Sequence, residues 1–387
     1  MYGLKQAAIL AYKLLLKRLA IDGYHPIPLT NGLFKHNKRK TIFALCVDDF
    51  GVKYTTPAAL NALTAHLRRK YTITQDDGTR FNGITLKWNY NDRECELSLP
   101  GYNQQALIRF KHPLPATPQR SPYPWNPPKY GQRVQYAEPT LLPSALKLPP
   151  KQLQRLQAII GTFRFNADSV DSTLQMPVSS LLTDASHVSA AEIDRRANHF
   201  LDYVATHPDA TLKFRASDMI LWAHSDASYL SEPKARSRAG GFYYLSNKPQ
   251  YPITASQPAP PLNGAIATKS KILDHVMSSA SEAETGAGYY NAKQLLPLRQ
   301  TLIELGHPQE ATPLQLDNQS ATQILNDTVS QKRSKAMDMR FYWLRDRVKQ
   351  NQFHIYWKQG KHNIADYFTK HHSPSHHRQM RSTFLFN

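Results

Sequence analysis

The stretch that decides the fold lies near the C-terminal end of the chain and reads PLQLDNQSA, from Pro313 to Ala321. Apolar and polar residues alternate in its first half, which is typical of a β-strand. The strand ends in Asp317, and a segment compatible with a helix follows. A strand that ends in Asp-Asn is most often a capped turn. A carboxylate at the end of a strand is also a common feature of metal-dependent phosphoryl-transfer sites. Whether Asp317 belongs to such a site therefore depends on which other acidic residues lie near it.

Two more acids precede this stretch. Asp226 follows a β-like run over 219–224, and Glu284 lies in a predicted helix over 281–296. The alternative for Asp226 is a cap at the end of a strand. The alternative for Glu284 is an exposed helix position, and Glu282 is its nearest rival, although residues two apart on a helix point in different directions. Both acids are candidates for one shared acidic site.

A fourth acid, Asp366, opens a predicted helix over 364–370. Its alternative is a plain N-terminal helix acid, stabilised by the helix dipole. His362 lies four residues earlier in a predicted loop, where it could help to protonate a leaving group or be inert. Carboxylates are the hard oxygen ligands that Mg²⁺ prefers, and two such cations activate water and stabilise the leaving oxygen in phosphodiester cleavage.

The composition indicates a polyanionic partner. Lys and Arg number 48 against 29 for Asp and Glu, so the net charge is +19, and nucleic acid is the first candidate. The alternative is an ordinary basic protein. Cys46 and Cys95 are the two cysteines, which excludes a disulfide framework and a zinc site made of cysteines alone. The sequence has no apolar run of membrane-spanning length and no signal-peptide pattern, so no membrane partner is expected.

The N-terminal part predicts a hairpin with two acids at its tip. The β-like runs 41–47 and 50–54 flank Asp48 and Asp49. An exposed turn is the plain interpretation of Asp-Asp. Because the flanking strands have residues of buried type, the pair also fits a polymerase palm, in which such carboxylates hold divalent metal. Residues 113–150 hold eleven of the 27 prolines and predict an extended linker, with a docking motif as the alternative.

Two further regions have competing interpretations. Residues 151–206 are predicted to be helical, either as a small packing module or, as the family resemblance given below implies, as a segment that connects two catalytic parts. The last part of the chain carries four histidines that look like a metal cluster, but the surrounding Ser and Pro favour a solvated tail. These histidines are His371, His372, His376 and His377.

The residues around the acids resemble the Pol polyproteins of copia-type LTR retrotransposons. In the N-terminal part, three matches come in the family's order: YGLKQA at 2–7, VDD within 47–49 and FNGI at 81–84. In the C-terminal part, VMSSASEAET at 276–285 and ADYFTK at 365–370 are similar to family motifs. The resemblance identifies the chain as the C-terminal part of such a polyprotein, with a truncated reverse transcriptase and a ribonuclease H (RNase H) domain.

The resemblance also implies roles for single residues. The order Asp, Glu, Asp, Asp is the layout of an RNase H domain, and the second Glu of SEAE corresponds to its catalytic Glu. One departure is the segment 334–338, where the family often has His and this chain has Ala336. The implied catalytic and Mg²⁺- or Mn²⁺-binding residues are Asp226, Glu284, Asp317 and Asp366, with Asp48 and Asp49 as the palm pair. The implied nucleic-acid contacts, facing the duplex, are Lys234, Arg236 and Arg238.

We therefore expect a multi-domain α+β and α/β protein, in which an RNase H-like mixed sheet with flanking helices follows a partial palm and a helical connection. The expected divisions are a partial reverse transcriptase (1–112), a Pro-rich linker (113–150), a thumb- or connection-like segment (151–210), an RNase H-like domain (211–371) and a tail (372–387).

The expected function is Mg²⁺-dependent endonucleolytic hydrolysis of RNA in RNA–DNA hybrids. The family's palm has another catalytic Asp upstream of YGLKQA, and this chain starts at that motif, so we expect the polymerase part to be inactive alone and to need the rest of a longer polyprotein. The alternatives are a basic nucleic-acid-binding relic without activity and an RNase H-fold module that acts through protein contacts. The resemblance implies a cytoplasmic location, allows for virus-like particles and nuclear access, and leaves the oligomeric state open.

Overall fold

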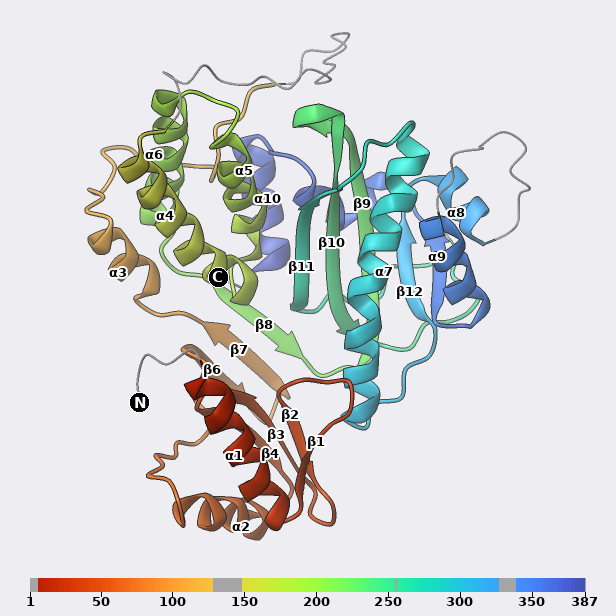
Figure 1. The fold of residues 1–387 in the computed structure, drawn as a ribbon. Coiled ribbons are helices and arrows are strands. Elements are labelled where there is room, and N and C mark those ends of the chain that lie inside the picture. The colour runs from red at the N-terminus through yellow and green to blue at the C-terminus, as the bar shows by residue number, and fades with distance from the viewer. Residues whose placement is uncertain (1–5, 128–147, 255, 327–338, 387) are drawn as a thin grey trace. The chain divides into compact units, whose positions relative to one another are not determined.

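The computed structural model describes residues 6–127, 148–254, 256–326 and 339–386. The chain divides into two compact units, shown together in Figure 1. The first unit comprises Met1–Leu86 and Pro297–His307, and the second comprises Lys87–Leu296 and Pro308–Asn387. The first unit thus ends earlier than the expected division at 112. Residues 2–5 of the YGLKQA motif, part of the Pro-rich stretch and the segment 334–338 lie outside the described residues.

The first unit contains a four-stranded antiparallel sheet in the order β1-β2-β3-β4. Its core includes Phe34 and Phe43, whose rings stack with centroids 4.9 Å apart. The predicted acidic hairpin is confirmed, because Cys46 of β3 lies opposite Asp49 of β4. The elements are α1 (Ala7–Ile21), β1 (Tyr24–Pro26), β2 (Leu33–His36), β3 (Thr41–Cys46), β4 (Asp49–Tyr54), α2 (Pro57–Arg68) and β5 (Arg80–Phe81), and β6 (Ile84–Asn89) leads into the second unit.

The second unit begins with a helical part that has its own core. Buried apolar residues of α3, α4, α5 and α6 pack together, with Phe163 and Phe200 in edge-to-face contact at 5.2 Å. Ser189 caps α6 by accepting a hydrogen bond from the Glu192 N–H. This confirms the predicted helices over 151–206. The elements are β7 (Glu94–Ser98), α3 (Tyr102–Arg109), α4 (Pro150–Ser169), η2 (Ser172–Leu174), α5 (Gln175–Asp184), α6 (Ala190–Thr206) and β8 (Thr211–Arg215), which pairs with β7.

A five-stranded mixed sheet in the order β11-β10-β9-β12-β13 forms the rest of the second unit. The β11–β10 and β10–β9 pairs are antiparallel, whereas β9–β12 and β12–β13 are parallel. The expected mixed sheet with flanking helices is therefore confirmed. Its elements are β9 (Ile220–Glu232), η3 (Pro233–Ala235), β10 (Arg236–Ser246), β11 (Ala265–Ile272), α7 (Ala280–Glu304), β12 (Thr312–Leu316), α8 (Gln319–Leu325), α9 (Met339–Lys349), β13 (Phe353–Trp357), η4 (Gly360–His362), η5 (Ile364–Phe368) and α10 (Pro374–Phe384). The last part of α7, residues 297–304, belongs to the first unit.

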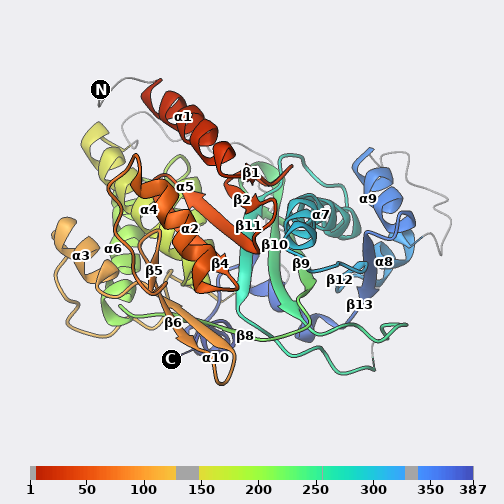
Figure 2. The ribbon, with the colours of Figure 1, turned by 90° about the horizontal axis from the view of Figure 1, so that it is seen from below.

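The two faces of this sheet have different covers. On one face, Ala239 of β10 packs against Ala283 and Ala287 of α7. On the other face, Phe242 of β10 packs against Phe368 of η5 and Phe384 of α10. Figure 2 shows the sheet between α7 and α10. The sheet thus lies between two apolar layers, as a sheet with helices on both faces requires.

Adjacent glycines in β10 allow both layers to approach closely. A Cβ on Gly240 would collide with the backbone of Ala365 in η5, and a Cβ on Gly241 would collide with Asn291 of α7. Successive residues of a strand point to opposite faces. Gly240 therefore allows η5 to approach β10 on one face, and Gly241 allows α7 to approach β10 on the other face. Because β10 pairs with β9, both elements lie close to Asp226.

Two predicted element ends are wrong. The strand over 219–224 continues as β9 to Glu232, because it pairs with β10 along most of its length. Asp226 consequently lies inside a strand and not after its end. The helix over 281–296 begins at Ala280 and continues through Pro297 to Glu304, although Pro lacks the N–H that a helix interior normally uses.

The predictions for the C-terminal part are wrong in two places. The helix expected over 364–370 is a short 3₁₀-helix, η5, capped by Asn363. The expected solvated tail instead contains the helix α10, in which His377 is 3% exposed. His377 lies between the hydroxyls of Tyr203 and Tyr367, at 2.7 and 2.6 Å.

Within the parts of the chain that the structure describes, none of the helices is both long enough and apolar enough to span a membrane.

Candidate active site

The parallel pairing of β9 with β12 places the carboxylates of Asp226 and Asp317 at the same height along the two neighbouring strands. His224 of β9 lies opposite Gln315 of β12, and the two strands run in the same direction. Two residues further along each strand come Asp226 and Asp317. Because neighbouring strands lie about 4.8 Å apart, these two acids become neighbours.

The helix α7 brings the third carboxylate. Asn291 is fully buried and donates from Nδ2 to Ser225 Oγ and to the Gly240 carbonyl, both at 2.8 Å. Its Oδ1 accepts a hydrogen bond from the Tyr243 hydroxyl at 2.6 Å. Glu284 lies two turns before Asn291, so these bonds fix the position of its side chain relative to the sheet.

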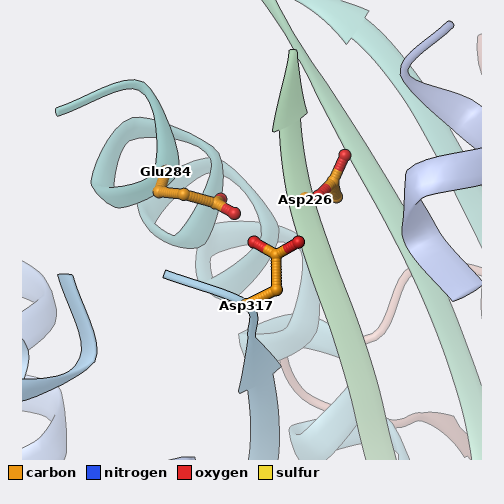
Figure 3. A group of neighbouring side chains, drawn as sticks. All are labelled: Asp226, Glu284 and Asp317. Carbon is orange, nitrogen blue, oxygen red and sulfur yellow. The ribbon is translucent and has the colours of Figure 1, made fainter. Parts of the chain in front are cut away.

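These three acids form one group. One carboxylate oxygen from each of Asp226, Glu284 and Asp317 lies within 4.8 Å of the other two. Figure 3 shows Glu284 on its helix and Asp317 at the end of its strand, pointing toward one another. Asp226 and Glu284 are each 4% exposed, and Asp317 is partly exposed. We refer to these three residues below as the acidic trio.

Burial and mutual repulsion make the charged form of the trio costly. Burial, followed by the nearby Asp366 and Asp317, raises the pKa of Asp226 to about 7. Burial, followed by the neighbouring carboxylates of Asp226, Asp317 and Asp366, holds the pKa of Glu284 well above its ordinary value. Groups whose pKa is shifted in this way by burial and specific partners are concentrated at functional sites.

Hydrogen bonds from the surrounding elements orient the trio. The Thr369 hydroxyl donates to Asp226 Oδ2 at 2.8 Å. The Trp357 Nε1–H donates to the Asp317 carbonyl at 2.9 Å. A Cβ on Gly360 would lie 2.9 Å from Asp317 Oδ2, so any other residue at this position would have to displace this carboxylate. Sequence reasoning missed Asn291, Thr369 and Gly360, whose roles depend on contacts with distant residues.

Asp366 lies beside the trio but is not part of it. Its Oδ1 accepts a hydrogen bond from Lys370 Nζ at 2.5 Å, and its side chain is 33% exposed. It is near enough to raise the pKa of Asp226 and Glu284. The structure thus brings three of the four predicted acids within mutual ligand distance and leaves the fourth at the edge. Its role as a ligand remains a prediction.

One of the predicted nucleic-acid contacts does not face a duplex. Arg238 is 0% exposed, and its Nε donates to Glu232 Oε1 at 2.5 Å. Its Nη1 donates to Ser179 and Ser270, so it fastens α5 to the sheet. The prediction for Arg238 is wrong because β10 is covered at this position. Lys234 is exposed and Arg236 is partly exposed, and their contacts with nucleic acid remain predictions.

The other candidates lie apart from the trio. Asp48 and Asp49 are exposed at the hairpin tip of the first unit, where Asp49 Oδ2 accepts a hydrogen bond from the Asn82 N–H at 3.0 Å. His362 is exposed, and its carbonyl accepts a hydrogen bond from Gln315 Nε2. Its chemical role stays open. Among the described residues, the four C-terminal histidines do not form a group that could hold a metal.

The residues of the trio suit a divalent cation. All three supply carboxylate oxygens, the ligand type that Mg²⁺ and Mn²⁺ favour. Glu284 Oε2 is buried and has no hydrogen-bond partner among the residues that the structure describes. A buried carboxylate without a partner is costly, and a bound cation would remove this cost together with the repulsion inside the trio.

Comparisons with known proteins find that part of the chain is similar to transposon polyproteins. No protein-family model matches it. It is 28% identical over 159 residues to the retrovirus-related Pol polyprotein from transposon TNT 1-94 of Nicotiana tabacum, which covers 41% of this chain and 11% of the relative. It is 30% identical over 154 residues to the truncated transposon Ty1-A Gag-Pol polyprotein of Saccharomyces cerevisiae, which covers 40% and 12%. The matches thus span about a tenth of the length of these relatives.

Solved structures similar to the chain include two RNase H proteins. RNase H1 from the archaeon Halobacterium salinarum has a TM-score of 0.22 and 13% identity over 36% of this chain and 83% of that one. The N-terminal RNase H domain of a Mycobacterium tuberculosis protein has a TM-score of 0.25 and 11% identity, over 43% and 97%. By the sequence matches, the homologues of this chain are Ty1/copia-type Gag-Pol polyproteins, and the chain is consistent with a fragment of a retrotransposon Pol protein.

Proposed function

We propose that the second unit is an RNase H that cleaves the RNA strand of RNA–DNA hybrids endonucleolytically, with Mg²⁺ or Mn²⁺ as its cofactor. The observation that carries this proposal is the acidic trio, in which three buried or partly buried carboxylates from two strands and a helix lie within 4.8 Å. The similarity to Pol polyproteins supports nucleic acid as the substrate, as does the net charge of +19.

Asp226, Glu284 and Asp317 would hold the cations, with Asp366 near enough to join them. When bound, divalent cations generate a nucleophilic water and stabilise the leaving oxygen of the phosphodiester. The chain's own part is to present these oxygens in a fixed arrangement: Asn291 fixes the helix of Glu284, and Thr369 orients Asp226. Lys234 and Arg236 would contact phosphates and position the hybrid without reading its sequence.

The first unit is proposed to be a fragment of a reverse-transcriptase palm, with Asp48 and Asp49 as its acidic pair. In this view the fragment works within a longer polyprotein, in the cytoplasm or in virus-like particles. A second candidate function is binding of nucleic acid without cleavage, which the net charge alone would support.

Cleavage of a hybrid labelled on its RNA strand tests the proposal. The wild-type chain should cut the RNA in Mg²⁺ and should not cut it in excess EDTA. Asp317→Asn should abolish cleavage while the protein still melts cooperatively, since the substitution keeps the side-chain shape and removes one of several repelling charges.

The matched control is Asp274→Asn, because the Asp274 side chain is 73% exposed and lies in the loop before α7. This variant should cleave like the wild type. Undiminished cleavage by Asp317→Asn would remove the trio from the reaction. A wild type that binds the hybrid but never cuts it would favour the binding-only alternative.

A further inference from the structure

The Pro-rich stretch packs against α6 where it passes Ser121 and Tyr123. Both residues are buried, with exposed fractions of 3% and 7%. His199 of α6 donates from Nε2 to the Ser121 carbonyl at 2.9 Å, and the Gln119 N–H donates to Thr206 Oγ1 at 2.9 Å. This part of the chain therefore has a fixed position on the helical part of the second unit.

The Tyr123 ring stacks on the imidazole of His371. The two ring planes differ by 5°, and their centroids are 3.8 Å apart. The Tyr123 hydroxyl donates to Asp184 of α5. Arg196 Nη1 of α6 donates to that hydroxyl at 3.0 Å and to Asp184 at 2.7 Å. A buried tyrosine hydroxyl usually has such partners, and here they hold the ring in place against His371.

A second contact holds His371 from α5. Ser180 is 6% exposed, and its Oγ lies within hydrogen-bond distance of His371 Nε2, at 2.9 Å. A cavity beside the stacked rings is lined in part by Tyr123, Lys370 and His371. Because this cavity leaves free space, removing the Tyr123 ring would let His371 move.

His371 lies two residues after a direct partner of the acidic trio. The Thr369 hydroxyl donates to Asp226 Oδ2, and Lys370 Nζ donates to Asp366 Oδ1. Two residues of chain span at most about 7 Å. A change in the position of His371 would therefore be passed to the two side chains that hold Asp226 and Asp366.

We propose that Tyr123 is a positioning residue for the acidic trio: by holding His371 in place, it fixes the segment through which Thr369 orients Asp226 for a divalent cation. This inference rests on the proposed function for the assignment of the trio as a metal site. Tyr123 acts only through His371 in this arrangement. The Pro-rich stretch and the helical part then belong to the working nuclease and do more than connect it to the first unit.

Binding of Mn²⁺ alone, measured by calorimetry on the full chain without nucleic acid, tests the proposal. Tyr123→Leu removes the ring and should raise the dissociation constant of Mn²⁺ by about 10-fold, the lower end of the range for residues that support metal ligands. Tyr123→Phe keeps the stacked ring and should bind Mn²⁺ as the wild type does. Ser180→Ala removes the second contact of His371 and should also weaken binding.

Two controls change similar groups that lie away from His371. Tyr102 contacts Phe165 within the helical part, with ring centroids 5.7 Å apart. Tyr102→Leu should lower the melting temperature and leave the affinity for Mn²⁺ unchanged. Ser186→Ala, at an exposed serine just after α5, should change neither quantity.

The proposal is overturned if Tyr123→Leu and Ser180→Ala bind Mn²⁺ like these controls, or if Tyr123→Phe binds it as weakly as Tyr123→Leu. If Tyr123→Leu does not fold, the comparison of Ser180→Ala with Ser186→Ala decides.

Hybrid cleavage separates this proposal from the proposed function. Single-turnover cleavage by Tyr123→Leu should be slow at low Mg²⁺ and should return to the wild-type rate when Mg²⁺ saturates. If the wild type binds Mn²⁺ but cuts no hybrid, the proposed function fails, and the Mn²⁺ affinities still decide on Tyr123. If the wild type cuts the hybrid and Tyr123→Leu needs no more Mg²⁺ than the wild type, the positioning role alone fails. A wild type that binds no Mn²⁺ overturns both.

Discussion

The two acidic groups of this protein, one in each unit, differ in their surroundings. Asp48 and Asp49 lie at the tip of the β3–β4 hairpin, and both are exposed to water. In the acidic trio, Asp226 and Glu284 are buried, and α7, β9 and β12 enclose the carboxylates. The hairpin pair comes from adjacent residues, whereas the trio comes from three separated parts of the chain.

This difference indicates that the burial of the carboxylates, more than their number, distinguishes a metal site from an exposed acidic turn. Exposed carboxylates are hydrated and screened, so a pair at a turn costs little. Buried carboxylates repel one another at low dielectric, and the pKa of Asp226 rises to about 7 as a result. Such a group destabilises the folded protein unless something compensates its charge. The experiments below test whether a bound cation does so.

The largest expected effect is on cleavage. Asp226→Asn should reduce the rate of hybrid cleavage by more than about 100-fold. Removing a residue that only supports a metal ligand costs up to about 100-fold, and removing a ligand itself should cost more. Asp49→Asn, the matched exposed substitution, should leave cleavage unchanged. Single-turnover rates in Mg²⁺ measure both. Equal rates for the two variants would erase the proposed distinction between the acidic groups.

Metal binding should also change stability. A divalent cation that binds only the folded trio stabilises it by about 2.7 kcal/mol at 100 times its dissociation constant. Thermal melts should therefore shift upward when Mg²⁺ replaces EDTA in the wild type and in Asp49→Asn. The shift should be much smaller in Asp226→Asn. An equal shift in all three proteins would mean that the stabilising cations bind elsewhere.

A smaller effect should appear in the pH dependence without metal. The folded pKa of Asp226 is about 7, above its ordinary value of 3.8. Its contribution to stability is therefore fully present below pH 3.8 and is lost as the pH rises through 7. In EDTA, Asp226→Asn should melt close to the wild type at pH 4 and above it at pH 7.5. A difference that stays constant across this range would contradict the raised pKa.

The smallest expected effect concerns the hairpin pair. Primer extension on a homopolymer template should be undetectable for the wild type and for Asp48→Asn alike. Among the described residues, the acids that come together as a possible metal site are those of the trio, and neither Asp48 nor Asp49 belongs to such a group. Extension by the wild type that disappears in Asp48→Asn would show a working polymerase site in the first unit.

Local sequence signals predicted several elements of the second unit. The alternating run before Asp317 forms β12, and Asn318 caps α8 by accepting a hydrogen bond from the Ala321 N–H. The signal for α10 was also present: Ser373 is its N-cap and Pro374 its first residue. The prediction of a solvated tail was wrong because the same Ser and Pro residues mark the start of this helix.

Other features followed from contacts that no local pattern contains. The strand β9 continues past Asp226 because β10 returns beside it. Arg238 follows Lys234 and Arg236 in a basic segment that looks exposed, yet α5 and Glu232 enclose it. Asp366 lies in a motif of the family, yet Lys370 holds its carboxylate at the edge of the site.

By itself, the sequence determined which acids were available, the strand that leads to Asp317, the helix that carries Glu284 and the basic charge of the chain. Only the tertiary structure decided that Asp226, Glu284 and Asp317 meet and that Arg238 is buried. The physical reason is that periodicity and capping act over a few residues, whereas the parallel pairing of β9 with β12 and the packing of α7 join residues far apart in the chain.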